Sequence, residues 1–225
     1  MKVAVVQLRI RVHVRMDLAA LLAATERAAD EGADVIVYPY APWITGQPLL
    51  EPFFANVEQR APGINWLRPG LRYAGGAMEA HATGLGRTVM LEGDDCIDTA
   101  TLALVRAMDC DALVWLFDAE DELQAEALLE LALEASVTLV PLVVIASLTG
   151  EACGIAQHGV SAIVHMGEIL AEADPDDEVL MADVPRASAP LERGHSLPEP
   201  APVLAQRLAA HRHTKLPVDY PAELS

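Results

Sequence analysis

The sequence has few basic residues, few aromatic residues and no long apolar run, and each shortage excludes a class of protein. Its 15 lysines and arginines are outnumbered by 33 aspartates and glutamates, which sets the formal net charge at −18. Because that charge repels a nucleic-acid backbone and an anionic membrane surface, we expect neither as a partner. The longest apolar run, Val137 to Ala146, is too short to span a bilayer.

Cysteine is also scarce. The three cysteines, Cys96, Cys110 and Cys153, lack the spacing of a metal site and leave one thiol unpaired in any disulfide scheme. We therefore predict reduced thiols, no metal site and no cofactor. The first residues enter an alternating strand pattern without a signal-peptide layout, so we expect a cytoplasmic protein.

What the chain does contain is enough apolar surface for one substantial core. Of its 225 residues 52% are hydrophobic, and the mean hydropathy is +0.26. Only 4% are aromatic, which favours helices packed closely on sheets. We predict a single α/β domain over residues 1–185, followed by a Pro-rich C-terminal extension over 186–225 that includes a short helix near 203–211.

The apolar patterning predicts alternating strands and helices. A buried strand over 2–8 leads to a helix that Asp17 caps and Gly32 ends, and a second strand covers 34–38. Asp118 is the predicted cap of a later helix. The remaining predicted strands are 87–92, 112–117, 137–146, 161–165 and 179–184, and the remaining helices are 99–108 and 119–135.

Between Ala41 and Thr83 the periodicity is lost, because prolines and glycines interrupt the sequence too often for long elements. We predict loop with short helical pieces there, as an irregular insertion or a remnant of lost elements.

Several segments resemble the nitrilase, or carbon-nitrogen hydrolase, superfamily in that family's own order. They are the opening strand at 2–7, the strand Val35-Ile36-Val37-Tyr38-Pro39, the strand and elbow at 85–95, the segment Cys110-Asp111-Ala112-Leu113-Val114, and the Gly-x-Ser strand with its hairpin at 158–173. The resemblance covers about three quarters of the chain and implies an α-β-β-α sandwich. The gap of 53 positions between Tyr40 and Gly93 is short for the family, so we expect the sandwich to be trimmed between the second strand and the elbow strand.

The resemblance also implies a Cys-Glu-Lys triad, in which a thiolate attacks the substrate carbon, a carboxylate moves the proton and an ammonium stabilises the developing charge. Here Tyr40 occupies the glutamate position and Gly93 the cysteine position. The only lysines are Lys2 and Lys215, near the two ends of the chain, so the triad lysine is absent. We therefore predict no catalytic triad.

The residues around these positions form the predicted remnant pocket: Tyr40, Trp43, Glu92, Gly93, Asp94 and Asp95. Tyr40 and Trp43 either line this pocket or plug it. Two or three carboxylates of the run 92–98 could bind Mg²⁺ or Ca²⁺. We prefer the alternative in which Asp95 or Asp98 caps the helix near Thr99 and the others are solvated or pair with arginines. Cys96 is a weak candidate for a relocated nucleophile, since its shift from the elbow turns the thiol toward the following helix.

The histidines, including His211 and His213, lack a third ligand at metal spacing, and we assign them to the surface. The leading functional hypothesis is a catalytically inactive nitrilase homologue that keeps the fold for binding or assembly. The alternative is a divergent hydrolase of amide or nitrile C–N bonds that uses Cys96 or the carboxylates near Gly93. A third hypothesis is a regulatory module that binds a small acyl or amide metabolite, and a protein ligand is a further open alternative. By resemblance we expect a homodimer formed through the helices at about 99–109 and 119–135.

Overall fold

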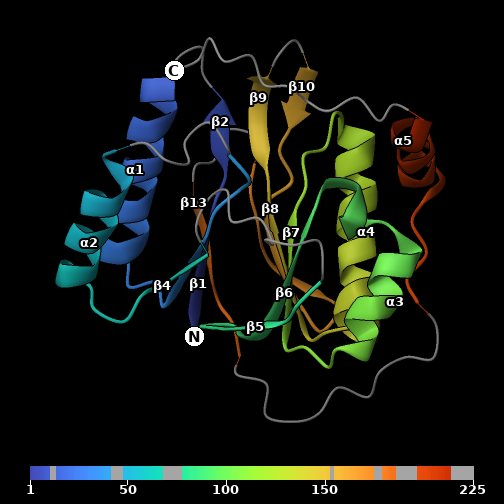
Figure 1. The fold of residues 1–225 in the computed structure, drawn as a ribbon, viewed down its shortest axis with the longest axis horizontal. Helices are drawn as coiled ribbons and strands as arrows, with labels where there is room; N and C mark the ends of the chain where they lie inside the picture. Colours follow the sequence, from blue (N-terminus) through green and yellow to red (C-terminus); the bar gives the residue numbers. More distant parts are fainter. Residues whose placement is uncertain are drawn as a thin grey trace.

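A computed structural model describes residues 1–10, 14–41, 48–67, 78–152, 155–174, 179–185 and 197–213. These residues form four layers, with helices outside two packed layers of β-sheet (Figure 1). Helices α1 and α2 cover one side of the sandwich, and α3, α4 and α5 cover the other.

The first layer contains a four-stranded sheet in the order β13-β1-β3-β4. Its strands are β1 (Lys2–Val6), β3 (Val35–Val37), β4 (Asn65–Leu67) and β13 (Val179–Asp183). Strands β1, β3 and β4 are parallel, whereas β13 pairs antiparallel with β1. A three-stranded sheet in the order β10-β9-β2 adds β2 (Leu8–Ile10), β9 (Leu148–Ala152) and β10 (Ile155–His158).

The other layer is a six-stranded sheet in the order β12-β11-β8-β7-β6-β5. Its strands are β5 (His81–Thr83), β6 (Gly86–Glu92), β7 (Ala112–Leu116), β8 (Leu142–Ala146), β11 (Ala162–His165) and β12 (Glu168–Glu172). The three central strands, β6, β7 and β8, are parallel and almost wholly buried, which explains their nearly continuous apolar sequence.

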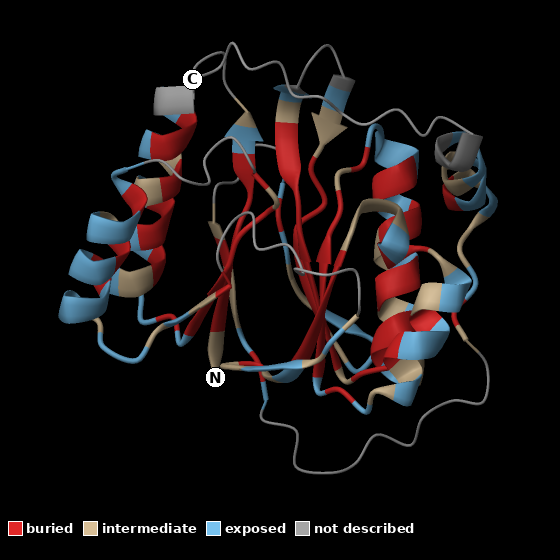
Figure 2. Cartoon of the chain, viewed as in Figure 1, coloured by how far each residue is buried: buried red, intermediate tan, exposed pale blue. Residues whose placement is uncertain are grey.

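The helices are α1 (Val14–Asp30), α2 (Leu50–Arg60), α3 (Thr99–Ala107), α4 (Glu122–Thr138) and α5 (Pro202–His213), with a short 3₁₀ helix η1 (Gly93–Cys96) after β6. Three apolar clusters fill the spaces between the four layers. Figure 2 shows the buried residues concentrated on the strands and on the inward faces of the helices. Alternate residues of each strand enter different clusters, as Leu113 and Val114 of β7 illustrate.

The segment predicted as irregular, from Ala41 to Thr83, contains more regular structure than its composition indicates. Helix α2 spans eleven residues, and β3, α2 and β4 form a parallel β-α-β unit. Pro52 is compatible with α2 because it lies in the first turn, where the backbone needs no N–H donor. The strand β4 has three residues and only Leu67 among them is buried, so its sequence shows no clear alternation of apolar and polar residues.

Two helix boundaries and one strand differ from the sequence prediction. Helix α1 begins at Val14, so Asp17 lies in its first turn rather than at its cap. Helix α4 continues through Val137 and Thr138, where the sequence predicts the start of a strand. Met166 and Gly167 form a tight turn that joins β11 to β12, within the hairpin predicted at 158–173. No helix among the described residues is long and apolar enough to cross a membrane.

Candidate functional site

The parallel strands of both layers end at the same edge of the sandwich. We call this edge the carboxyl edge and define it by one residue that follows each strand: Gln7 after β1, Tyr40 after β3, Gly93 after β6, Asp118 after β7 and Ser147 after β8. Ligands of open α/β sheets bind outside the carboxyl ends of the strands. The carboxyl edge is therefore the candidate functional site.

Gly93 forms a sharp elbow between β6 and η1. Its φ is +56°, in the left-handed region, directly after the extended Glu92. A Cβ built on Gly93 meets no atom of the described residues within 4 Å. A side chain at this position would therefore meet none of the described residues at its Cβ, so the described part of the chain leaves room for one.

The carboxylates near Gly93 have separate roles. Asp98 caps α3, its Oδ2 accepting from the backbone N–H of Thr101 at 2.9 Å. Partial burial, followed by the Asp98 and Asp94 carboxylates, raises the pKa of Asp95. No group of three or more acidic, histidine or cysteine side chains within the described ranges is arranged to hold a metal ion.

Cys96 lies on the helix side of the second layer. Its side chain is fully buried in the apolar cluster that includes Ile97 and Leu102. Burial raises the pKa of the thiol well above its ordinary value, the Asp95 carboxylate adds to the shift, and a hydrogen bond with the Leu116 backbone opposes it. The neutral, enclosed thiol is a poor nucleophile.

Tyr40 is half-buried and packs against the apolar cluster between the two layers, whereas Trp43 lies outside the described residues. Lys2 starts β1 at the opposite edge of the sandwich, where its Nζ donates to the carbonyl oxygen of Glu31 at 2.9 Å. Lys215 also lies outside the described residues. Lys2 thus lies at the end of β1 that is far from the carboxyl edge, and it cannot serve a site there.

Asp118 belongs to the carboxyl edge, although the sequence indicated a helix cap. Asp121 caps α4 instead, its Oδ1 accepting from the N–H of Gln124 at 2.9 Å. Asp118 Oδ1 accepts from the N–H of Leu148 at 2.8 Å and so joins the ends of β7 and β8. Burial raises the pKa of Asp118 to about 6; the Leu148 hydrogen bond and Arg207 lower it, and the nearby Glu92 carboxylate raises it further.

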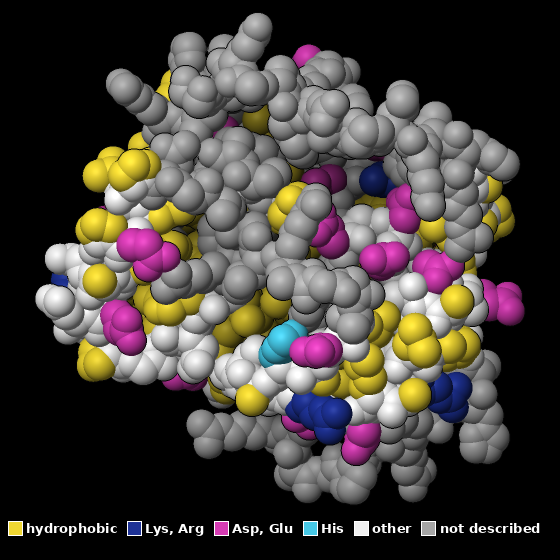
Figure 3. Space-filling view, viewed as in Figure 1, with side chains coloured by type: hydrophobic (Ala, Val, Ile, Leu, Met, Phe, Trp, Pro, Cys, Tyr) yellow, Lys and Arg dark blue, Asp and Glu magenta, His cyan; other side chains and the backbone are white. Residues whose placement is uncertain are grey.

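Arg207 on α5 reaches the same edge. No pattern in the sequence predicted that this arginine belongs to the site. Its Nη1 donates at 2.8 Å both to the carbonyl oxygen of Asp118 and to Oε1 of Gln124. The guanidinium carbon lies 4.4 Å from the ring centroid of Phe117, and Nε is 3.5 Å from Asp94 Oδ1. In the space-filling view, acidic side chains gather at the upper right around a basic one (Figure 3).

A buried hydrogen-bond network joins the two layers at the carboxyl edge. Gln7 Oε1 accepts from the N–H of Ser161 at 3.1 Å and from Ser147 Oγ at 3.4 Å, while its Nε2 donates to the carbonyl oxygen of Asp174 at 2.8 Å. Ser161 Oγ accepts from the N–H of Ser147 at 3.1 Å. Both serines are fully buried and hydrogen-bonded, so their hydroxyls have a structural role.

No family profile matches the sequence, and no curated protein matches it in sequence. Several solved structures are similar in fold. In one, a mutant amidase from Nesterenkonia sp. AN1 in which acrylamide has added to the active-site cysteine, the TM-score is 0.63 at 14% identity over 82% of this chain and 93% of the amidase. Another mutant of the Nesterenkonia amidase, described as a nitrilase-superfamily protein, has a TM-score of 0.60 at 16% identity, with 95% and 97% of the two chains covered.

A carbon-nitrogen hydrolase from Helicobacter pylori G27 has a TM-score of 0.64 at 12% identity, with 81% of this chain and 88% of the hydrolase covered. The similarity extends over most of each protein. The chain therefore has the nitrilase-like α-β-β-α fold that its sequence indicated.

Proposed function

We propose that the protein is a nitrilase-superfamily homologue without cysteine-dependent C–N hydrolysis, which keeps the fold for binding and assembly. The observation that carries this proposal is the elbow at Gly93. Gly93 has a left-handed backbone and no described atom within 4 Å of a built Cβ, which would suit a nucleophile there, but it has no side chain. In a mutant of a Nesterenkonia amidase of the same fold, acrylamide has added to an active-site cysteine.

The chemistry at the carboxyl edge supports the same proposal. Covalent hydrolysis of an amide needs an activated nucleophile, a base and a group that stabilises the oxyanion. Cys96 is enclosed between the six-stranded sheet and the helices that cover it. Ser147 and Ser161 are held in the hydrogen-bond network. Loss of a nucleophile alone costs on the order of 10⁶-fold in kcat in a well-studied hydrolase.

An ammonia-release assay tests the proposal. The purified protein is incubated with acetamide, acrylamide, acetonitrile and an N-carbamoyl amino acid, with an active nitrilase-superfamily amidase as the positive control. We expect no release above the background of a Glu92→Gln variant. Turnover that co-purifies with the native chain and disappears in the variant would overturn the proposal.

A second candidate function rests on Asp118. A carboxyl group with a pKa of about 6 beside a second carboxylate, Glu92, has the protonation behaviour of a general acid or base. A hydrolase that activates water with these two groups would lose activity in both Asp118→Asn and Glu92→Gln. Thiol alkylation would leave it active, because Cys96 takes no part in that reaction.

The binding role that we propose concerns the space over Gly93, and its ligand class is small acyl or amide compounds. A ligand that binds only the folded protein raises its melting temperature by mass action. We expect acetamide or propionamide to raise the melting temperature of the native chain. We expect no rise in Gly93→Asn, because its side chain occupies the space and asparagine tolerates the left-handed backbone. Equal shifts in both proteins would exclude this site.

We also propose that the protein is a homodimer that pairs through α3 and α4. Each of these helices exposes a large apolar side chain, with Leu104 57% exposed and Leu123 59% exposed. Exposed apolar side chains on adjacent helices are typical of a protein interface.

A further inference from the structure

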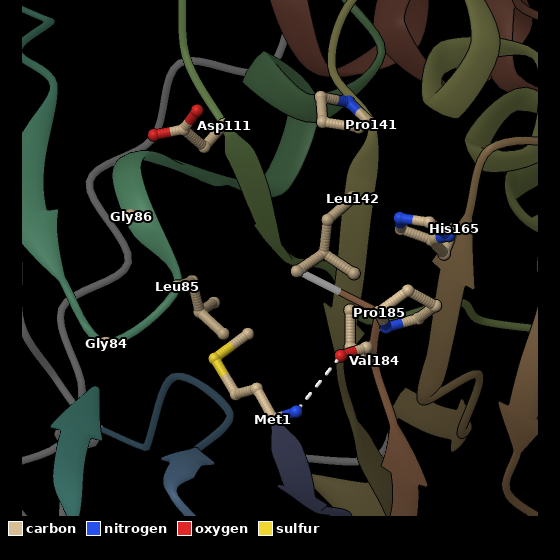
Figure 4. A pocket seen from close by; sticks show the side chains of 10 residues that line it. All are labelled: Met1, Gly84, Leu85, Gly86, Asp111, Pro141, Leu142, His165, Val184 and Pro185. Atoms are coloured by element: carbon tan, nitrogen blue, oxygen red, sulfur yellow. Dashed lines mark hydrogen bonds between the residues drawn. The ribbon is translucent and has the colours of Figure 1, made fainter. Parts of the chain in front are cut away.

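A cavity lies at the edge of the sandwich opposite the carboxyl edge, where the parallel strands begin. Its volume is about 350 Å³, within the range of pockets that hold small molecules. We call it the amino-edge pocket; its lining includes Met1, Leu85, Asp111, Leu142, His165 and Val184. These residues come from both layers, so the pocket opens between the two sheets (Figure 4).

The walls of the pocket are apolar and fixed by the fold. Leu85, Leu142 and Val184 are each at most 5% exposed and belong to the cluster between the layers. The Met1 amino group donates to the carbonyl oxygen of Val184 at 3.2 Å, which ties the start of β1 to the end of β13. The apolar body of a ligand would therefore contact preformed core surface.

Asp111 holds a carboxylate at the rim. Its Oδ2 accepts from the backbone N–H of Arg87 at 2.7 Å. Gly86 allows this approach, since its φ is +94° and a Cβ on it would lie 2.6 Å from Asp111 Oδ2. The carboxylate is thus positioned by a turn that only glycine accommodates without strain.

His165 provides the second polar group. It follows Val164 at the end of β11, and its Nε2 is buried and has no hydrogen-bond partner among the described residues. Burial lowers the pKa of the imidazole, although the Glu168 carboxylate opposes the shift. Figure 4 shows the imidazole beside Leu142 and Pro185, with Asp111 across the pocket. Buried nitrogen atoms of this kind are normally satisfied, which points to an external partner.

We propose that the amino-edge pocket binds a small uncharged molecule with an apolar body and a hydroxyl group that hydrogen-bonds to His165. Asp111 and the net charge of −18 disfavour anions. The apolar walls and the unpartnered nitrogen together favour an alcohol over a fully apolar molecule. This site is separate from the carboxyl edge and does not depend on the function proposed there.

Three matched probes test the proposal on the native chain: benzyl alcohol, benzyl methyl ether and benzoate. They share the ring and differ in the head group. Binding is followed by NMR of methyl-labelled leucine and valine. We expect benzyl alcohol to shift the methyl signals of Leu85, Leu142 and Val184 saturably, the ether to bind about tenfold more weakly, and benzoate to leave these signals unchanged.

Two variants sharpen the result. His165→Phe keeps an aromatic ring and removes both imidazole nitrogens, so the preference for alcohol over ether should disappear. His158→Phe, at the far end of the sandwich, is the matched control and should keep the preference. The absence of saturable shifts at the three pocket residues with benzyl alcohol, or equal binding of alcohol and ether to the native chain, would overturn the proposal without any reference to the variants.

Discussion

At the scale of single residues, the backbone conformation of Gly93, and not crowding by its neighbours, favours glycine. Its φ is +56°, yet no atom of the described residues lies within 4 Å of a Cβ built on it. Gly167 has the same backbone handedness but a Cβ there would lie 2.9 Å from Val137 Cγ2. A side chain at Gly93 would therefore add backbone strain alone, whereas one at Gly167 would add both backbone strain and steric overlap.

Gly93→Ala is expected to destabilise the protein by about 1 kcal/mol, the cost of a left-handed alanine. Gly93→Asn should cost less, because asparagine adopts this conformation more readily. Gly167→Ala should cost more than Gly93→Ala, since overlap with Val137 adds to the strain. Urea unfolding of the three variants measures these differences. A Gly93→Ala protein as stable as the native chain would contradict the left-handed elbow.

The raised pKa of Asp118 predicts how the stability of the protein depends on pH. Its pKa is about 6 in the folded protein, above its ordinary value of 3.8. Between these values the folded state binds more protons than the unfolded state, so this group reduces stability as pH rises. We expect Asp118→Asn to gain stability relative to the native chain as pH rises from about 4 to above 6, with most of the change complete by neutral pH. Urea unfolding at a series of pH values measures the difference, and a difference independent of pH would contradict the assigned burial.

At the scale of elements, α5 contacts the candidate site through Arg207. Leu204 is fully buried in the cluster under α4, and only 12% of the Arg207 side chain is exposed. The contacts of Arg207 reach the ends of β6 and β7 as well as the first turns of α4. The position of α5 and the electrostatics of Asp118 are therefore linked.

Arg207→Ala is expected to lower the free energy of unfolding by about 2 kcal/mol, because it removes charge-assisted hydrogen bonds and a stacked ring contact. Arg60→Ala is the matched control. The Arg60 pair with Glu26 leaves both side chains nearly half exposed, so its loss should cost well under about 1 kcal/mol. Urea unfolding and hydrogen exchange of α5 measure both effects. Equal losses in the two variants would show that Arg207 does not anchor α5.

At the scale of the whole molecule, the exposed leucines of α3 and α4 predict the oligomeric state. The double variant Leu104→Glu and Leu123→Glu should be monomeric, since it places charge in the proposed interface. Leu49→Glu is the control, because Leu49 is 63% exposed but lies next to α2 on the opposite side of the sandwich. Sedimentation velocity gives the masses. A native chain that sediments as a monomer would exclude the dimer.

Prediction from the sequence succeeded for the buried strands β6 and β7, because their apolar runs act over a few residues. Of the predicted helix caps, the choice between Asp95 and Asp98 is settled in favour of Asp98, whereas the caps predicted at Asp17 and Asp118 were wrong.

Prediction also failed for Val137 and Thr138, whose β-branched side chains favour strands but which continue α4. Packing of the neighbouring Ala135 and Ser136 keeps that turn helical.

The sequence by itself determined the layered α/β fold and the absence of a cysteine at the elbow, because both depend on residue identity and short-range pattern. Only the tertiary structure brought Asp118, Arg207 and Gln7 to one edge, and only it opened a pocket between Asp111 and His165 at the other. Such sites join residues from distant segments. Their burial and their missing partners arise when the layers pack, so no local pattern encodes them.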